Sequence, residues 1–135
     1  MSQPLNIAIA GASGRMGRML IEAVLADPHA KLSGALDVPA AAGLGQDAGA
    51  FLGRDSGVAI CAELERGLAG AQCLIDFTRP EGTMAHLAAC RQRGVSMVIG
   101  TTGFSDAQKE EIARAAQDIA VVMARSEEHT SELQS

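Results

Sequence analysis

The stretch "LNIAIAGASGRMGRMLIEAVLA", residues 5–26, decides the fold. Its first six residues form a short apolar run that ends at a glycine, which is typical of a buried strand in a parallel sheet. Apolar side chains then recur at helical spacing: Met16, Met19, Leu20, Ala23 and Val24. Because Asp27 and Pro28 end this pattern, the stretch predicts a strand, a turn and a helix over residues 15–26.

Three glycines mark the junction of the predicted strand and the predicted helix: two lie between them, and the third lies in the first turn of the helix. Gly11 permits a tight turn, Gly14 lets the backbone approach a pyrophosphate, and Gly17 lets the helix pack close to the strand. The amino terminus of the helix offers free N–H groups to an anion. Because the chain has 15 glycines, the motif is weak by itself, but its position between strand and helix favours dinucleotide binding. A tight turn without a ligand is the alternative.

Asp37 follows a second predicted strand, residues 31–36, and lies twenty residues after Gly17. This is close to the offset of about 20 residues at which an acid binds the ribose hydroxyls of a dinucleotide. The alternative is that Asp37 only begins a turn with Pro39. Because the glycine turn precedes it, we favour ribose binding as the role of Asp37.

The rest of the chain alternates strands and helices up to residue 124. Residues 38–57 are predicted to be a long loop with at most one helical turn. The further predicted strands are residues 58–61, 73–77, 96–99 and 119–123, and the further predicted helices are residues 64–68, 81–93 and 106–117. For the last helix, Ser105 is the expected N-cap and Gln108 completes a capping box. This order predicts an α/β fold with a Rossmann-like, doubly wound parallel sheet.

Composition narrows the class of protein and its partners. The chain has 135 residues, of which 47% are hydrophobic, with no Trp or Tyr and three Phe, so one domain with an aliphatic core is expected. The net charge of −5 disfavours a nucleic-acid partner. No apolar run approaches the ~20 residues of a membrane span, and no signal peptide is visible, so we expect no membrane partner and a cytoplasmic location. The three cysteines lack CxxC spacing, and no metal site is expected.

Two loops at the carboxyl ends of predicted strands are rich in glycine and small hydroxyl residues. They are "FTRPEGT", residues 77–83, and "GTTGFS", residues 100–105. Ligands of open α/β sheets bind at these strand ends, and such loops suit close approach to a nicotinamide. Ordinary turn chemistry explains either loop equally well when it is considered alone.

Taken together, "IAIAGASGRMGR", "IDFTRPEGT", "VIGTTGF" and the strand after them closely resemble the dihydrodipicolinate reductase family of bacterial diaminopimelate and lysine synthesis. The resemblance covers residues 5–124. It implies that a glycine-turn set wraps the pyrophosphate: Gly11, Ala12, Ser13, Gly14, Arg15 and Met16. It implies that Asp37 takes the ribose, and that a second set, with residues 77–79, lines the nicotinamide side: Gly100, Thr101 and Thr102. Ala124 is also expected to contact the cofactor.

The resemblance further implies an NADH- or NADPH-dependent oxidoreductase that reduces 4-hydroxy-tetrahydrodipicolinate, a small dicarboxylate, and that is a homotetramer at full length. NADH is the expected preference, because relatives that use NADPH well commonly have an arginine directly after the acid, whereas Val38 and Pro39 follow Asp37. Arg15 and Arg18 are possible substitutes. Two alternatives stay open: a stand-alone non-catalytic nucleotide-binding or redox-sensing domain, and another NAD-dependent enzyme such as a homoserine or aspartate-semialdehyde dehydrogenase.

The family's catalytic His-His-Arg motif lies in a second domain, so no catalytic residue is expected here. We expect residues 1–124 to be an incomplete dinucleotide-binding domain, truncated before the substrate domain, and the chain to be inactive as a reductase. Residues 125–135, "RSEEHTSELQS", resemble a translated sequencing adapter and are expected to be a foreign or disordered tail; a natural polar tail is the alternative. His29, His86 and His129 are expected to be structural or exposed.

Overall fold

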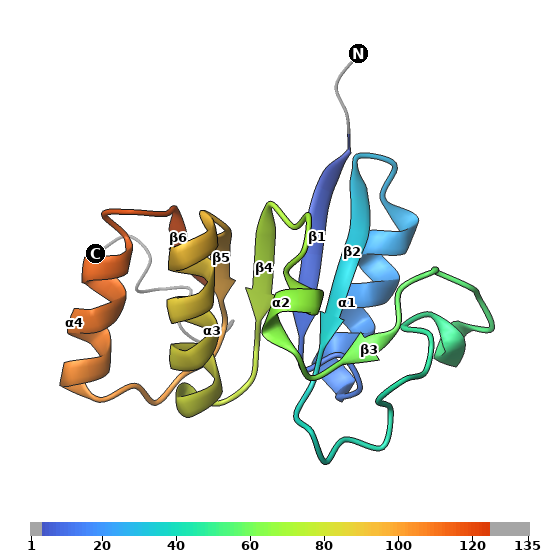
Figure 1. Cartoon of the computed structure of the whole chain (residues 1–135), viewed down its shortest axis with the longest axis horizontal. Coiled ribbons are helices and arrows are strands. Elements are labelled where there is room, and N and C mark those ends of the chain that lie inside the picture. Colours follow the sequence, from blue (N-terminus) through green and yellow to red (C-terminus); the bar gives the residue numbers. More distant parts are fainter. Residues whose placement is uncertain (1–3, 125–135) are drawn as a thin grey trace, which may run out of the picture.

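The computed structural model describes residues 4–124, which form one six-stranded, all-parallel sheet in the order β3-β2-β1-β4-β5-β6 (Figure 1). The strands are β1 (Leu5–Ala10), β2 (Ala30–Leu36), β3 (Ile60–Cys61), β4 (Cys73–Asp76), β5 (Ser96–Ile99) and β6 (Val121–Met123). The helices are α1 (Arg15–Ala26), the 3-10 turn η1 (Ala50–Leu52), α2 (Leu64–Gly67), α3 (Pro80–Arg93) and α4 (Asp106–Ala115). The predicted Rossmann-like fold class is confirmed.

The strand order reverses between β1 and β4. The chain first winds outward from β1 through β2 to β3, and then crosses back to place β4 on the other side of β1. The carboxyl ends of parallel strands all lie on one edge of the sheet, and ligands of such folds bind at that edge beside the point of reversal. The topology therefore locates the candidate site before any side chain is considered.

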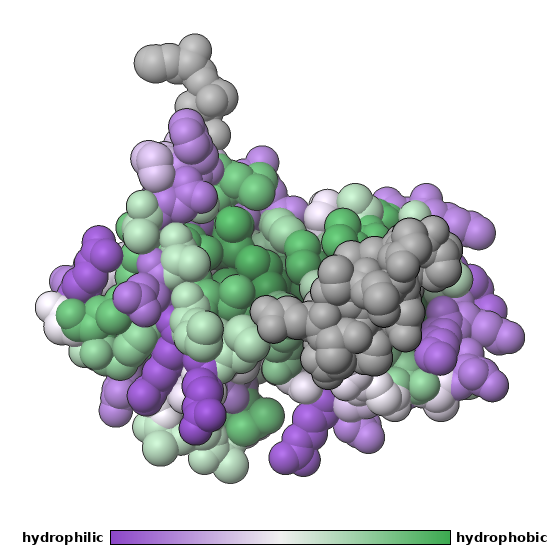
Figure 2. Space-filling model, turned by 180° about the vertical axis from the view of Figure 1, so that it is seen from behind, coloured by the Kyte–Doolittle hydropathy of each residue, from purple (hydrophilic) through white to green (hydrophobic). Residues whose placement is uncertain are grey.

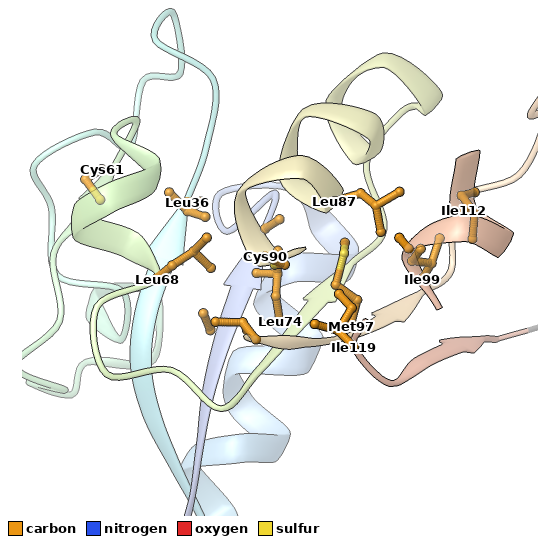
Figure 3. Close-up of a cluster of buried hydrophobic side chains, with 14 residues drawn as sticks. Leu36, Cys61, Leu68, Leu74, Leu87, Cys90, Met97, Ile99, Ile112 and Ile119 are labelled. Carbon is orange, nitrogen blue, oxygen red and sulfur yellow. The ribbon is translucent and has the colours of Figure 1, made fainter. Parts of the chain in front are cut away.

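Two aliphatic clusters pack on the two faces of the sheet. On one face, Ile21 and Val24 of α1 pack with Ile9 and Leu32 of the sheet. On the other face, side chains of α3 and α4 meet those of β4 and β5, as Figure 3 shows for Leu74, Leu87, Cys90, Met97, Ile99 and Ile112. The buried hydrophobic side chains of residues 4–124 are all aliphatic or sulfur-containing, which confirms the expectation of an aliphatic core.

Close backbone approach explains several small residues. A Cβ atom on Gly17 would overlap the carbonyl group of Gly11, so α1 packs directly on the turn that precedes it. A Cβ on Gly34 of β2 would likewise overlap the carbonyl of Gly67 in α2. The first contact was predicted from the sequence; the second was not.

Some element boundaries differ from the sequence-based predictions. The third strand is shorter than residues 58–61, because Ala59 instead forms an antiparallel bridge with Asp47 of the preceding loop. The last strand begins at Val121 rather than at residue 119. Ile119 precedes the strand and is buried in the core cluster that includes side chains of α3 and α4. The predicted helix over residues 106–117 ends at Ala115. The other elements differ by one residue at most, and the predicted capping box at the start of α4 is present.

The surface is mixed in character. Figure 2, which shows the molecule from behind, has apolar surface in its central part and polar side chains around it. Among residues 4–124, no helix combines the length and apolarity needed to cross a membrane. The tail predicted over residues 125–135, with His129, lies outside the described residues.

Candidate functional site

The predicted site residues all lie at the carboxyl edge of the sheet. Hydrogen bonding continues one residue past the strands and fixes the first residue of each loop. The amides involved are those of Gly11 to Leu36 O (2.8 Å), Asp37 to Cys61 O (2.9 Å), Gly100 to Asp76 O (2.8 Å) and Ala124 to Ile99 O (2.7 Å). Four of the predicted cofactor-contacting residues are therefore held by the sheet itself. The structure brings the segments after β1, β2, β5 and β6 to one side, as the sequence predicted.

The glycine turn after β1 is held against β2. Gly11 has φ of 80°, a conformation that favours glycine, and the amides of Gly11 and Ala12 both donate to the Leu36 carbonyl at 2.8 and 3.0 Å. The Gly14 amide closes the turn by donating to the Gly11 carbonyl at 3.0 Å. A Cβ on Gly14 would meet only an ordinary contact at 3.4 Å, and the residue is exposed, so packing inside the chain does not demand glycine there.

Helix α1 begins beside this turn with an uncapped amino terminus. Gly14 is the N-cap and offers no side-chain hydrogen bond, and the first turn holds no acidic residue. The backbone N–H groups of the first helical turn have no partner within the helix, and the helix dipole adds positive potential. Arg15 and Met16 in this turn are exposed. The arrangement suits an anion.

Asp37 contacts the glycine turn directly. One carboxylate oxygen accepts hydrogen bonds from the Ser13 amide, at 2.8 Å, and from the Ser13 hydroxyl. The other oxygen accepts from the Val38 amide at 2.8 Å. The carboxylate therefore bonds a residue 24 positions earlier in the sequence, in the glycine turn. The alternative role, in which Asp37 only begins a turn with Pro39, does not account for this contact.

The loops after β4 and β5 lie against each other and against the glycine turn. A Cβ on Gly100 would overlap the Phe77 ring, so the ring packs directly on the backbone there. The Thr78 amide donates to the Thr101 hydroxyl at 3.0 Å. On its other side, the Thr78 methyl would be 3.2 Å from a Cβ on Gly11. Of the predicted nicotinamide-side residues, Thr101 is buried and Thr102 is exposed.

Sequence reasoning missed three buried or nearly buried polar residues behind these loops. Asp76 ends β4 and is fully buried, as is Thr83 of α3, and His86 contacts Asp76 with its Nδ1 atom 2.6 Å from the carboxylate. His86 was expected to be structural or exposed; its side chain is 15% exposed and lies against the Asp76 carboxylate. The sequence offered one indication of this cluster: an aspartate is the last residue of the otherwise apolar run "CLID", where a buried acid needs hydrogen-bond partners.

Two of the cysteines, Cys73 and Cys90, have thiols of raised pKa. Burial, with a smaller effect from the Asp76 charge, raises the pKa of the Cys90 thiol to about 12. Burial also raises the pKa of Cys73. Because the thiolate is the reactive form of cysteine, these shifts make both thiols poor nucleophiles and ligands.

Comparison with known proteins identifies the family. The family model described as dihydrodipicolinate reductase, N-terminus, matches residues 5–126. The chain belongs to the dihydrodipicolinate reductase family, to its N-terminal part. This confirms the resemblance that the glycine turn and the two later loops indicated.

Similar relatives share this part of the family's sequence. The 4-hydroxy-tetrahydrodipicolinate reductases of Cupriavidus taiwanensis and Cupriavidus pinatubonensis are each 68% identical to this chain over 120 residues, which cover 89% of this chain and 45% of each relative. Among solved structures, dipicolinate-bound dihydrodipicolinate reductase from Paenisporosarcina sp. TG-14 superposes with a TM-score of 0.72 at 25% identity, covering 90% of this chain and 47% of that one. The chain therefore spans less than half the length of the relatives it matches.

Proposed function

We propose that this chain is the nicotinamide-dinucleotide-binding part of a 4-hydroxy-tetrahydrodipicolinate reductase. The single observation that carries the proposal is the contact between Asp37 and Ser13, which brings the expected ribose-binding acid onto the glycine turn at the point where the strand order reverses. The name shared by relatives that are 68% identical supplies the reaction.

The pyrophosphate of the cofactor would bind at the turn and the start of α1. The first-turn amides supply unpaired donors, Gly14 permits close approach, and Arg15 adds a positive charge at the exposed rim. Gly11, Ala12 and Ser13 hold this turn in place through their bonds to Leu36 and Asp37. Met16 flanks the same helix end with an exposed apolar side chain.

The adenosine ribose would bind at Asp37. One of its oxygens already accepts two hydrogen bonds from Ser13, and the other accepts one from Val38, so a ribose hydroxyl would bond the second oxygen or replace the Ser13 hydroxyl on the first. The Val38 side chain, 60% exposed, offers apolar surface beside it for the adenine.

NADH is the proposed preferred cofactor. A 2′-phosphate in place of the ribose hydroxyl would meet the Asp37 carboxylate, and no arginine follows that acid to pair with the phosphate. Arg18, one possible substitute, has its guanidinium carbon 5.4 Å from the centroid of the Phe51 ring, a cation–π arrangement that occupies it elsewhere.

The nicotinamide would lie toward the loops after β4 and β5 and the residue that follows β6. The residues proposed to line it are Phe77, Gly100, Thr101, Thr102 and Ala124. The bound cofactor supplies the hydride for the reduction, and residues of this chain bind it and orient its nicotinamide end. The proposal extends to a small dicarboxylate substrate, a homotetrameric full-length protein and a cytoplasmic location; these three rest on the family resemblance.

Two experiments test the proposal. NADH, NADPH and ADP-ribose are titrated into the chain by calorimetry. We expect saturable binding of all three ligands and a lower Kd for NADH than for NADPH. A folded chain that binds none of the three ligands contradicts the proposal.

The reductase activity is tested in a chimera. Residues 1–124 replace the matching part of the Cupriavidus taiwanensis relative, and NADH oxidation is followed with enzymatically generated substrate, with the unaltered relative as control. Comparable turnover by the chimera supports the assignment, and a folded, tetrameric but inactive chimera contradicts it.

A further inference from the structure

Three buried polar residues of the described chain gather under the site. Asp76 and Thr83 have no exposed surface, and Thr101 is 6% exposed; they are the buried polar or charged residues among residues 4–124. They come from β4, α3 and the loop after β5, which are far apart in the sequence. A buried polar side chain is unfavourable unless it is hydrogen-bonded, so their bonds are decisive.

The Asp76 carboxylate gathers donors from two segments. One oxygen accepts from the Thr78 amide at 3.0 Å and from the Thr78 hydroxyl at 2.6 Å. The other lies 2.6 Å from Nδ1 of His86, whose side chain is 15% exposed. At this distance the ring nitrogen and the carboxylate oxygen share a hydrogen bond. Asp76 thereby ties the start of the loop after β4 to the second turn of α3.

The Thr101 hydroxyl is fixed from the other side. It accepts one hydrogen bond from the Thr78 amide at 3.0 Å and one from the Thr83 hydroxyl at 2.8 Å. These two bonds use both lone pairs of the Thr101 oxygen. The contact open to its own proton inside the chain is the Asp76 carbonyl at 3.5 Å, which already accepts from the Gly100 amide at 2.8 Å. Among the described residues, the Thr101 hydroxyl therefore donates through this long contact, and a closer ligand acceptor could compete for its proton.

We propose that Asp76, Thr83 and His86 are positioning residues that orient Thr78 and Thr101 toward the nicotinamide end of the cofactor. The network makes Thr101 a hydrogen-bond donor to a ligand acceptor such as the carboxamide oxygen. The inference rests on the proposed function, because it assumes that a nicotinamide dinucleotide binds at this edge of the sheet. It adds residues that do not themselves touch the ligand.

The test separates the two ends of the cofactor. NADH and ADP-ribose are titrated by calorimetry into the wild-type chain and into Thr83→Val, which keeps the side-chain shape and removes the hydroxyl. Losing one hydrogen bond that orients Thr101 is expected to raise the Kd for NADH about three- to tenfold. The Kd for ADP-ribose, which lacks the nicotinamide, is expected to stay within about twofold. Thr83→Ser, which retains the hydroxyl, is expected to restore NADH binding.

Matched variants exclude a general loss of stability. Leu87→Val lies on the same buried face of α3 and removes packing without touching the network, so it is expected to leave the ratio of the two Kd values unchanged. If Thr83→Val does not fold, His86→Leu, which removes the partner of Asp76, is judged by the same ratio.

The outcomes distinguish this inference from the proposed function. Wild type that binds neither ligand overturns the proposed function, and the positioning role with it. Wild type that binds both, with a ratio of Kd values that Thr83→Val leaves unchanged, overturns the positioning role alone. Equal weakening of both ligands also overturns it, since a merely structural effect would act on the whole site.

Discussion

Replacing Asp37 by alanine removes the one carboxylate that the structure holds against the glycine turn. In the proposed complex this carboxylate accepts hydrogen bonds from the adenosine ribose, and a hydrogen bond to a charged group is worth about 1.5–3 kcal/mol. The Kd for NADH should therefore rise roughly ten- to hundredfold. The Kd for NADPH should rise far less, because the same change removes repulsion of the 2′-phosphate. The selectivity for NADH should nearly disappear.

The loss of internal contacts adds little to this effect. Asp37→Ala leaves the amides of Ser13 and Val38 and the Ser13 hydroxyl without their acceptor. These groups are half-buried or exposed, so water can replace the carboxylate. We expect the free energy of unfolding to fall by no more than about 1–2 kcal/mol.

Calorimetric titration of NADH and NADPH at one ionic strength measures the effect, since charge interactions with a phosphate depend on salt. Asp27→Ala is the matched control, because that aspartate ends α1 at the opposite edge of the sheet and, among the described groups, its side chain accepts a hydrogen bond only from the His29 amide. Wild type with equal affinity for both cofactors, or Asp37→Ala with unchanged NADH affinity, would refute the assignment of Asp37.

Three further predictions follow from the packing and the charges. Gly17→Ala should destabilise the chain by about 1–3 kcal/mol in urea unfolding, because the new Cβ overlaps the Gly11 carbonyl; stabilisation, as intrinsic helix propensity alone predicts, would contradict this. Asp47 has its pKa lowered from 3.8 to about 2, chiefly by the backbone hydrogen bond from Ser56, so its stabilisation is complete above about pH 4 and is lost as the pH falls toward 2. The full shift corresponds to about 2 kcal/mol, and solvent screening reduces it to about 1 kcal/mol. Wild type and Asp47→Asn should therefore differ by about 1 kcal/mol in urea unfolding at about pH 6 and converge at low pH; a constant difference would disprove it. Cys90, with a pKa of about 12, should resist alkylation at about pH 8 until denaturant is added, as mass spectrometry can measure; rapid labelling of the native chain would argue against its burial.

The sequence predicted best what local chemistry determines. Helix α1 has the predicted bounds because its apolar period is regular and Pro28 follows it. The glycine turn was found because the steric demands of Gly11 and Gly17 arise between residues that are close in sequence. The short β3 was predicted too long, because the competing partner of Ala59 lies in a loop without any periodic pattern.

The buried network was missed for the opposite reason. Apart from the local bonds between Asp76 and Thr78, the bonds of this network join residues 5 to 25 positions apart, and threonine and histidine have no period that marks them as partners. A sequence alone also does not reveal that Gly34 faces Gly67, since that contact exists only after α2 packs on β2. Burial and partnership are properties of the assembled fold, so the residues that depend on them cannot be derived from spacing.

The residues that directly follow the strands and the buried polar residues act together at the carboxyl edge of the sheet. Each of four residues directly follows a strand and extends the hydrogen-bonded ladder by one residue: Gly11, Asp37, Gly100 and Ala124. The backbone of the proposed site is therefore ordered before any ligand binds, and binding need not supply the free energy to order it. The ladder does not reach the side chains of Thr78 and Thr101, which lie beyond it and would otherwise rotate. Hydrogen bonds from the buried side chains of Asp76 and Thr83 restrain these two side chains. The buried network therefore preorganises the side chains of the proposed site, as the parallel sheet preorganises its backbone.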